Sequence, residues 1–175
     1  MHKRVWILAT AILVVFSVTA CTPFQQYRTV YPEVCVSSTP APSPECETHA
    51  LQQLPTANGS HYLLGFIEFD DQGQLWDRKQ MSEVVGKLAG EAGTKEVLMV
   101  VFVHGWKHSA APGDGNIETF RQVLAQLSDS ETQFAKLTGA PAREVAGVYL
   151  GWRGGSVTVP TGHMTSPAAR YPSAT

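Results

Sequence analysis

The chain has 175 residues, of which 43% are hydrophobic and 16% are charged, and its formal net charge is −2. This length and composition suit one globular domain with a hydrophobic core. The charge argues against a nucleic-acid partner, which would call for a basic face, and no segment repeats with the period of a solenoid.

Residues 1–20 have the pattern of a secretory signal peptide. After a basic start, residues 5–18 form an apolar run that is shorter than the roughly 20 residues of a membrane-spanning helix. The stretch Val18-Thr19-Ala20-Cys21 resembles the lipobox of bacterial lipoproteins. That resemblance implies an acylated Cys21 as the first mature residue, anchored in the cell envelope. Since Thr22 follows, it further implies the outer membrane, facing the periplasm. The alternative is an ordinary signal peptide with a coincidental cysteine.

Residues 21–60 are rich in Pro, Ser and Thr and predict a tether rather than a packed domain. They contain Cys35 and Cys46, which we expect to pair in an oxidising envelope. Such a bond would stabilise the fold by about 3 kcal/mol in the entropic model. The alternative is two free thiols in a mobile linker. A metal site is not indicated, because neither C-x-x-C spacing nor a matched histidine pair is present.

The predicted domain covers residues 61–157 and begins with the apolar and aromatic run at residues 61–70, which predicts a strand. Asp77 is expected to cap the next helix, with Gln80 completing a capping box. Residues 97–103 contain no polar side chain, so they predict a strand buried on both faces, as in a parallel sheet.

A second helix is predicted to begin at Asn116, its expected N-cap. Its apolar face comprises Ile117, Phe120, Leu124, Leu127 and Phe134. Residues 145–150 predict a third strand, and the alternation of strands and helices predicts an α/β layer with right-handed crossovers. Residues 158–175 have no acidic residue and no apolar periodicity, so we predict that they are disordered.

The turn His104-Gly105-Trp106 ends the most apolar strand and leads through a loop to a helix. With the surrounding "FVHGWKHSA", Asp114, and "GVYLGWRGGS", it resembles the α/β-hydrolase superfamily, in a group of bacterial esterase- and lipase-like proteins. The resemblance covers about residues 61 to 156. It implies a partial α/β-hydrolase sheet flanked by helices, and a serine hydrolase that acts on a small ester or acyl substrate without a cofactor.

In that family, the loop after the third strand supplies a backbone N–H to the oxyanion hole. The resemblance therefore implies that Trp106 gives the amide, that Gly105 permits the sharp turn, and that His104 braces the loop.

These residues also have other interpretations. His104, His108 and Asp114 together suggest a metal, but they lie in a loop without an H-E-x-x-H helix, so we expect no metal. Trp106 and Trp152 can be packing residues at strand ends. Arg153 could pair with Asp114 or with a substrate carboxylate, although an exposed cation is the simpler interpretation.

A Gly-x-Ser-x-Gly nucleophile elbow is missing from the sequence. The nearest segment holds Ser156, but the residues that follow, including Pro160, oppose the helix that an elbow needs. His163 lies beyond this serine, whereas no acidic residue follows Glu144. Ser156 is therefore only a weak candidate, and we identify no catalytic residue. The chain resembles the N-terminal part of a hydrolase, cut short near residue 158 and inactive.

Two functions remain open for the chain. The first is an envelope lipoprotein of hydrolase type, held at the membrane through Cys21. The second is a non-catalytic envelope lipoprotein whose α/β module binds a partner or ligand. In the family resembled, the third strand lies between the fourth and the nucleophile-bearing fifth. The resemblance thus implies an open edge along residues 97–103, and open edges favour self-association.

Overall fold

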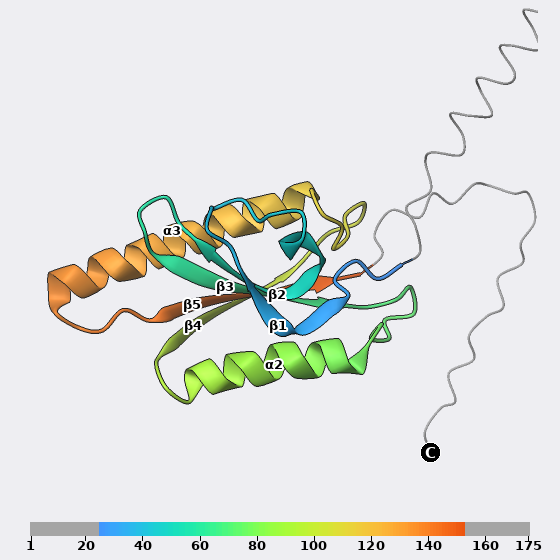
Figure 1. Ribbon diagram of the computed structural model, residues 1–175, viewed down its shortest axis with the longest axis horizontal. Coiled ribbons are helices and arrows are strands. Elements are labelled where there is room, and N and C mark those ends of the chain that lie inside the picture. Colours follow the sequence, from blue (N-terminus) through green and yellow to red (C-terminus); the bar gives the residue numbers. More distant parts are fainter. Residues whose placement is uncertain (1–24, 153–175) are drawn as a thin grey trace, which may run out of the picture. The chain divides into compact units, whose positions relative to one another are not determined.

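The computed structural model describes residues 25–152, shown in colour in Figure 1. In chain order its elements are β1 (Val30–Val36), the 3-10 helix η1 (Cys46–Thr48), β2 (His49–Pro55), β3 (His61–Glu68), α2 (Arg78–Ala92), β4 (Val97–Val103), α3 (Gly115–Thr138) and β5 (Glu144–Gly151). The predictions for residues 1–20, Cys21, Ser156 and residues 158–175 lie outside the described residues. No helix within residues 25–152 is long and apolar enough to cross a membrane.

All five strands form one mixed sheet in the order β1-β2-β3-β5-β4. The strands β3, β5 and β4 run parallel, β1 is parallel to β2, and β2 is antiparallel to β3. The predicted run of strand, helix, strand, helix and strand is thus present as β3, α2, β4, α3 and β5. Since β5 lies between β3 and β4, the chain crosses over the sheet twice, and the carboxyl ends of three parallel strands meet at one side.

The two helices cover opposite faces of the sheet (Figure 1). The α3 face buries a core that includes Leu54, Tyr62, Leu64, Phe66, Ile117, Phe120, Leu124, Val145 and Tyr149. The α2 face buries a second core that includes Ala50, Leu51, Leu63, Ile67, Val84, Leu88, Ala146 and Val148. Alternate residues of β3 and β5 point to opposite faces, so these two strands are buried on both sides.

An aspartate caps each helix. The Asp77 side chain accepts a hydrogen bond of 2.7 Å from the Lys79 backbone N–H, as predicted for α2. For α3 the predicted cap, Asn116, is wrong, because the helix begins at Gly115 and Asp114 accepts from the Asn116 N–H at 2.9 Å. The Asp114 carboxylate is the better cap because it satisfies a free N–H and carries a charge that suits a helix N-terminus.

The predicted tether over residues 21–60 needs correction, because Val30–Val36 and His49–Pro55 are strands of the sheet. Leu51 and Leu54 are fully buried, and so is the polar side chain of Gln52. Gln52 donates to the Cys46 backbone carbonyl at 2.7 Å and accepts from Arg121 at 3.0 Å. Polar residues that are buried with hydrogen-bond partners break the apolar alternation, and this concealed β2 in the sequence.

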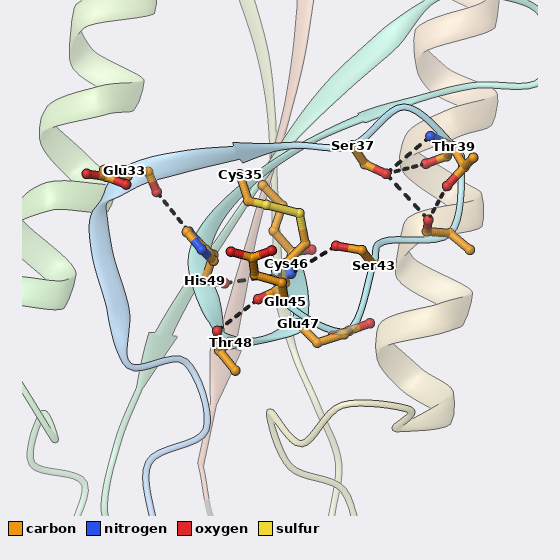
Figure 2. The surroundings of a disulfide bond; sticks show 12 residues. Glu33, Cys35, Ser37, Thr39, Ser43, Glu45, Cys46, Glu47, Thr48 and His49 are labelled. Carbon is orange, nitrogen blue, oxygen red and sulfur yellow. Dashed lines mark hydrogen bonds between the residues drawn. A yellow bond between two sulfur atoms is a disulfide. The ribbon is translucent and has the colours of Figure 1, made fainter.

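The predicted disulfide between Cys35 and Cys46 is present and joins β1 to η1 (Figure 2). Its sulfurs lie beside Ser43, whose hydroxyl accepts a hydrogen bond of 3.3 Å from the Cys46 N–H. Glu47 follows Cys46 directly, so the bond also fixes the position of a residue in the buried polar network described below.

The prediction that residues 97–103 are buried on both faces is wrong. Met99, Val101 and Val103 are 55%, 56% and 60% exposed. Their neighbours Val100 and Phe102 pack against the α3 core, where the Phe102 ring lies 5.2 Å from that of Phe120. The cause is the position of β4 at the sheet edge, since α2 packs over β1, β2 and β3. One face of β4 is therefore covered by α3 and the other is open.

Candidate functional site at the carboxyl ends of the parallel strands

His104 connects the end of β4 to the end of β5. Its Nε2 accepts a hydrogen bond of 2.9 Å from the Trp152 backbone N–H, so Nε2 carries no proton. Nδ1 then carries the proton and donates to the Gly105 carbonyl at 2.9 Å. The Trp152 indole N–H returns a 3.0 Å bond to the His104 carbonyl. Both ring nitrogens of this buried histidine are therefore occupied in joining two strand ends.

Aromatic stacking adds to these bonds. The His104 ring lies 5.4 Å from the Trp152 ring with an interplanar angle of 3°, and 5.6 Å from the Tyr149 ring at 24°. The Tyr149 hydroxyl donates to the Ser109 carbonyl at 3.2 Å, and burial raises the pKa of Tyr149. A neutral Tyr149 therefore links β5 to the loop after β4. The stacking of its ring on His104 makes Trp152 a packing residue at the carboxyl end of β5.

The backbone of the turn differs from the sequence expectation at Gly105. A positive φ of 77° occurs at Lys107, and a Cβ placed on Gly105 would meet no heavy atom within 4 Å. The reversal of the chain therefore does not depend on the conformational freedom of Gly105. The side chain of Trp106 is 64% exposed, and the Lys107 ammonium lies 5.2 Å from the centre of its ring.

The backbone N–H of Trp106, the predicted oxyanion-hole donor, makes no hydrogen bond to any residue between 25 and 152. A donor in this state can bind an anionic oxygen without breaking an existing bond. It lies at the carboxyl end of β4.

His108 and Asp114 form a second polar pair on the same loop. The His108 Nδ1 lies 3.0 Å from Asp114 Oδ1, and the Ser109 backbone N–H donates to Asp114 Oδ2 at 3.0 Å. Asp114 thus orients His108 while capping α3. His104 takes no part, and residues 25–152 contain no group of three His, Cys, Asp or Glu side chains that could hold a metal ion.

Sequence reasoning missed the polar cluster at the end of β3. The buried Glu68 carboxylate accepts from the backbone N–H groups of Tyr27 and Arg28, at 2.9 and 2.7 Å. Gln80 from α2 donates to the Arg28 carbonyl at 2.7 Å and accepts from the Glu68 N–H at 2.8 Å. Gln80 is therefore not part of the predicted capping box. These bonds fasten residues 27 and 28 across the carboxyl end of β3.

The Arg28 guanidinium reaches from there to the loop after β4. It is fully buried, lies 4.1 Å from the centre of the Phe66 ring, and donates from Nε to the Ala110 carbonyl at 3.0 Å. It also donates to the Glu47 carboxylate at 2.5 Å and to the Glu47 carbonyl. Burial lowers the pKa of Arg28, and Glu47 opposes that shift.

Glu47 receives a second arginine, Arg121 from α3, at 3.0 Å. Burial alone would raise the pKa of Glu47, but hydrogen bonds from Arg121 and Arg28 outweigh it and hold the pKa below its usual value. Arg121 also pairs with Glu118 at 2.7 Å. The Nη2 of Arg28 and the Nε of Arg121 have no partner among the described residues. The Glu47 carboxylate thus joins η1 to Arg28, which precedes β1, and to Arg121 of α3.

The described residues do not assemble a nucleophile with a base. The hydroxyl of Ser109 accepts from the Ala111 N–H at 3.2 Å, and within residues 25–152 no serine hydroxyl is bonded to either His104 or His108. The structure does bring together the end of β5, the predicted turn residues and the loop up to Asp114. A signal for Glu68 was available, because it is a charged residue within an apolar run. No pattern in the sequence pointed to Arg28.

Comparison with protein-family models, with curated proteins and with solved structures finds no match.

Proposed function

We propose that the chain is a lipid-anchored envelope protein whose domain is built like the oxyanion-hole part of an α/β-hydrolase, and that it does not itself turn over esters. The supporting observation is that the Trp106 N–H, at the carboxyl end of β4, makes no hydrogen bond to any of residues 25–152. The strand order adds support, because β4 pairs with β5 on one side only among the described strands. Its other side is where the resembled family has its nucleophile strand.

The lack of turnover follows from the chemistry of acyl transfer. A serine hydrolase needs a hydroxyl activated by a histidine that a carboxylate orients in turn. His108 and Asp114 supply the second half of that arrangement, at 3.0 Å. Between residues 25 and 152 no serine hydroxyl is bonded to His108, and Ser156 stands in a segment without the elbow pattern. An oxyanion donor alone stabilises charge but forms no covalent intermediate.

Turnover is tested with the full chain and short-chain aryl esters, beside a Ser156→Ala variant. We expect both proteins to hydrolyse the esters at the buffer rate. Hydrolysis well above that rate that is lost in Ser156→Ala would contradict the proposal and make Ser156 the nucleophile.

The anchor is tested separately by mass spectrometry of the membrane-extracted protein and of a Cys21→Ala variant. We expect an N-terminal peptide that begins at Cys21 and carries acyl mass, absent from the variant. A soluble periplasmic form with a free Cys21 thiol would contradict the anchor without touching the argument on turnover.

A non-catalytic binding module is the second candidate, and one observation favours it. The polar side chains Glu68 and His104 at the carboxyl ends of β3 and β4 are already used, since Glu68 receives two backbone N–H groups and His104 uses both ring nitrogens. Reading the coding DNA beyond codon 175 separates the candidates. A continuation with Gly-x-Ser-x-Gly would support the hydrolase relationship, and its absence would support the binding module.

A further inference from the structure

The edge strand β4 has an exposed side-chain face and, among the described residues, an edge without a partner strand. On the α2 face, the side chains of Met99, Val101 and Val103 are each more than half exposed. Along its outer side, β4 pairs with no other strand of the described chain. The strand contains no charged residue and no proline, which are the usual features that keep an exposed edge from pairing.

The direction of the backbone groups in β4 follows from one hydrogen bond. The Glu96 carbonyl accepts from the Glu144 N–H at 2.8 Å, so Glu96 directs its backbone toward β5. In a strand, the N–H and C=O of one residue point to the same side, and successive residues alternate. The residues that face outward are therefore Val97, Met99, Val101 and Val103. Three of these residues, Met99, Val101 and Val103, also expose their side chains on the α2 face, while Val97 packs against the α2 core.

We propose that β4 pairs antiparallel with β4 of a second copy of this chain, about a twofold axis at Val100. The four outward residues are symmetric about that position. In this register Val97 lies opposite Val103 of the second copy, and Met99 lies opposite Val101. Each such pair exchanges two N–H···O=C bonds, so no outward backbone group of β4 is left without a partner.

Self-complementarity is the reason to choose a second copy over another strand. A twofold axis requires the same surface on both partners. This strand meets that requirement at its two ends, where Val97 and Val103 are the same residue type. In this register, odd-numbered residues of one copy pair with odd-numbered residues of the other. Met99 and Val101 of both copies therefore lie on the same face of the joined sheet. Their exposed side chains then cover each other between the two α2 helices. The apolar strand brings no like charges together at any of its seven positions.

This inference goes beyond the proposed function and does not depend on it, because it uses only the direction and exposure of β4. Loss of the dimer would leave the results on turnover and on the Cys21 anchor unchanged. A chain that hydrolyses esters could equally pair through this strand.

Analytical ultracentrifugation of the full chain in mild detergent tests the pairing, with lysine placed at Val101 and, in a second variant, at Met99. Both side chains are exposed, so neither change disturbs the core. The matched control is Val36→Lys at the opposite edge, where the side chain is 68% exposed. We expect a dimer for the parent and for Val36→Lys, and monomers for Val101→Lys and Met99→Lys.

The pairing would be overturned by a monomeric parent at every concentration, by dimers that persist in both edge variants, or by a Val36→Lys protein that dissociates with them. Large polydisperse species in the parent would also overturn it, because a twofold pair is closed.

Cysteine cross-linking tests the register. In the proposed pair, Val100 faces its own copy at a non-hydrogen-bonded position, with Cα atoms about 4.5 Å apart, which is within the range of a disulfide. Val100→Cys should therefore give a covalent dimer under mild oxidation, beyond any formed by the parent. Leu98→Cys, which lies opposite Phe102 of the second copy, should not. The reverse result, or equal dimers from both variants, would overturn the register.

Discussion

At one edge of the sheet, β1 carries Pro32 and Glu33 and is tied to η1 by the disulfide at Cys35, whereas β4 at the other edge runs through seven residues without charge or proline. The pairing of β1 with β2 also shifts register between Val30 and Val34. Proline, charge and an irregular register each discourage a further strand from adding to an edge. None of the three is present in β4.

The two edge strands of the sheet are therefore held and protected differently. The β1 strand is held in place by its own chain, since Arg28 just before it pairs with Glu47 of η1 and the disulfide joins Cys35 to η1. Among the described residues, nothing pairs with the outward backbone groups of β4, and its Val101 and Val103 side chains are exposed. An edge of this kind is a binding surface when a partner covers it and an aggregation hazard when none does.

Removing the buried guanidinium of Arg28, which lies just before β1, should have the largest effect on stability. Arg28→Ala leaves Glu47 without one of its two arginines and removes the bond to Ala110. We expect the free energy of unfolding to fall by about 3–5 kcal/mol, the usual effect of breaking a buried pair. Arg143→Ala, which breaks an exposed pair with Glu131, should cost less than about 1 kcal/mol in the same urea titration. Equal losses of unfolding free energy in the two variants would show that the buried Arg28–Glu47 pair does not hold the β1 side of the domain in place.

The disulfide should come next. Replacing Cys35 and Cys46 together by Ser should lower the free energy of unfolding by about 3 kcal/mol, because the bond closes a short loop of the unfolded chain. Amide exchange should then rise in β1 and stay unchanged in β4. Equal increases in both strands would mean that the bond stabilises the whole domain rather than one edge.

Acid should lower the free energy of unfolding by protonating Glu47, which holds the segment before β1. Its pKa in the folded protein lies below the usual value, so its ion pairs stabilise the fold above the unfolded pKa of about 4.3. That stability is lost as the pH falls through the lower folded pKa. The difference in unfolding free energy between the parent and Glu47→Gln should therefore shrink from pH 7 to pH 3. A constant difference across this range would contradict the role of the charge.

The smallest effect is expected at the carboxyl end of β4. Gly105→Ala should change the free energy of unfolding by less than about 0.5 kcal/mol, because the residue has no positive φ and a Cβ there meets open space. The matched control is Gly147→Ala in β5, where a Cβ would overlap Leu124 Cδ1 and cost about 1–3 kcal/mol. A large loss from Gly105→Ala would restore the predicted need for glycine in the turn.

Local patterns predicted much of this fold. Asp77 indicated the start of α2, the apolar runs indicated β3, β4 and β5, and two cysteines in one short segment indicated the disulfide. These features depend on residues close together in the chain.

The remaining features depend on contacts between distant residues, which one sequence does not reveal. β2 was missed because the burial of Gln52 depends on a hydrogen bond from Arg121, which lies 69 residues away in the chain. Glu68 and Gln80 acquire their roles only when residue 28 crosses the end of β3. The apolar composition of β4 indicated burial, but the extent of burial is set by where α2 lies over the sheet.

Amide hydrogen exchange at increasing protein concentration tests the contrast between the two edges most directly. The account predicts that the N–H groups of Val97, Met99, Val101 and Val103 exchange rapidly in dilute protein and become protected as concentration rises, while β1 keeps the same protection throughout. Protection of these four N–H groups that does not depend on concentration would show that the chain covers its own β4 edge, and would contradict the account.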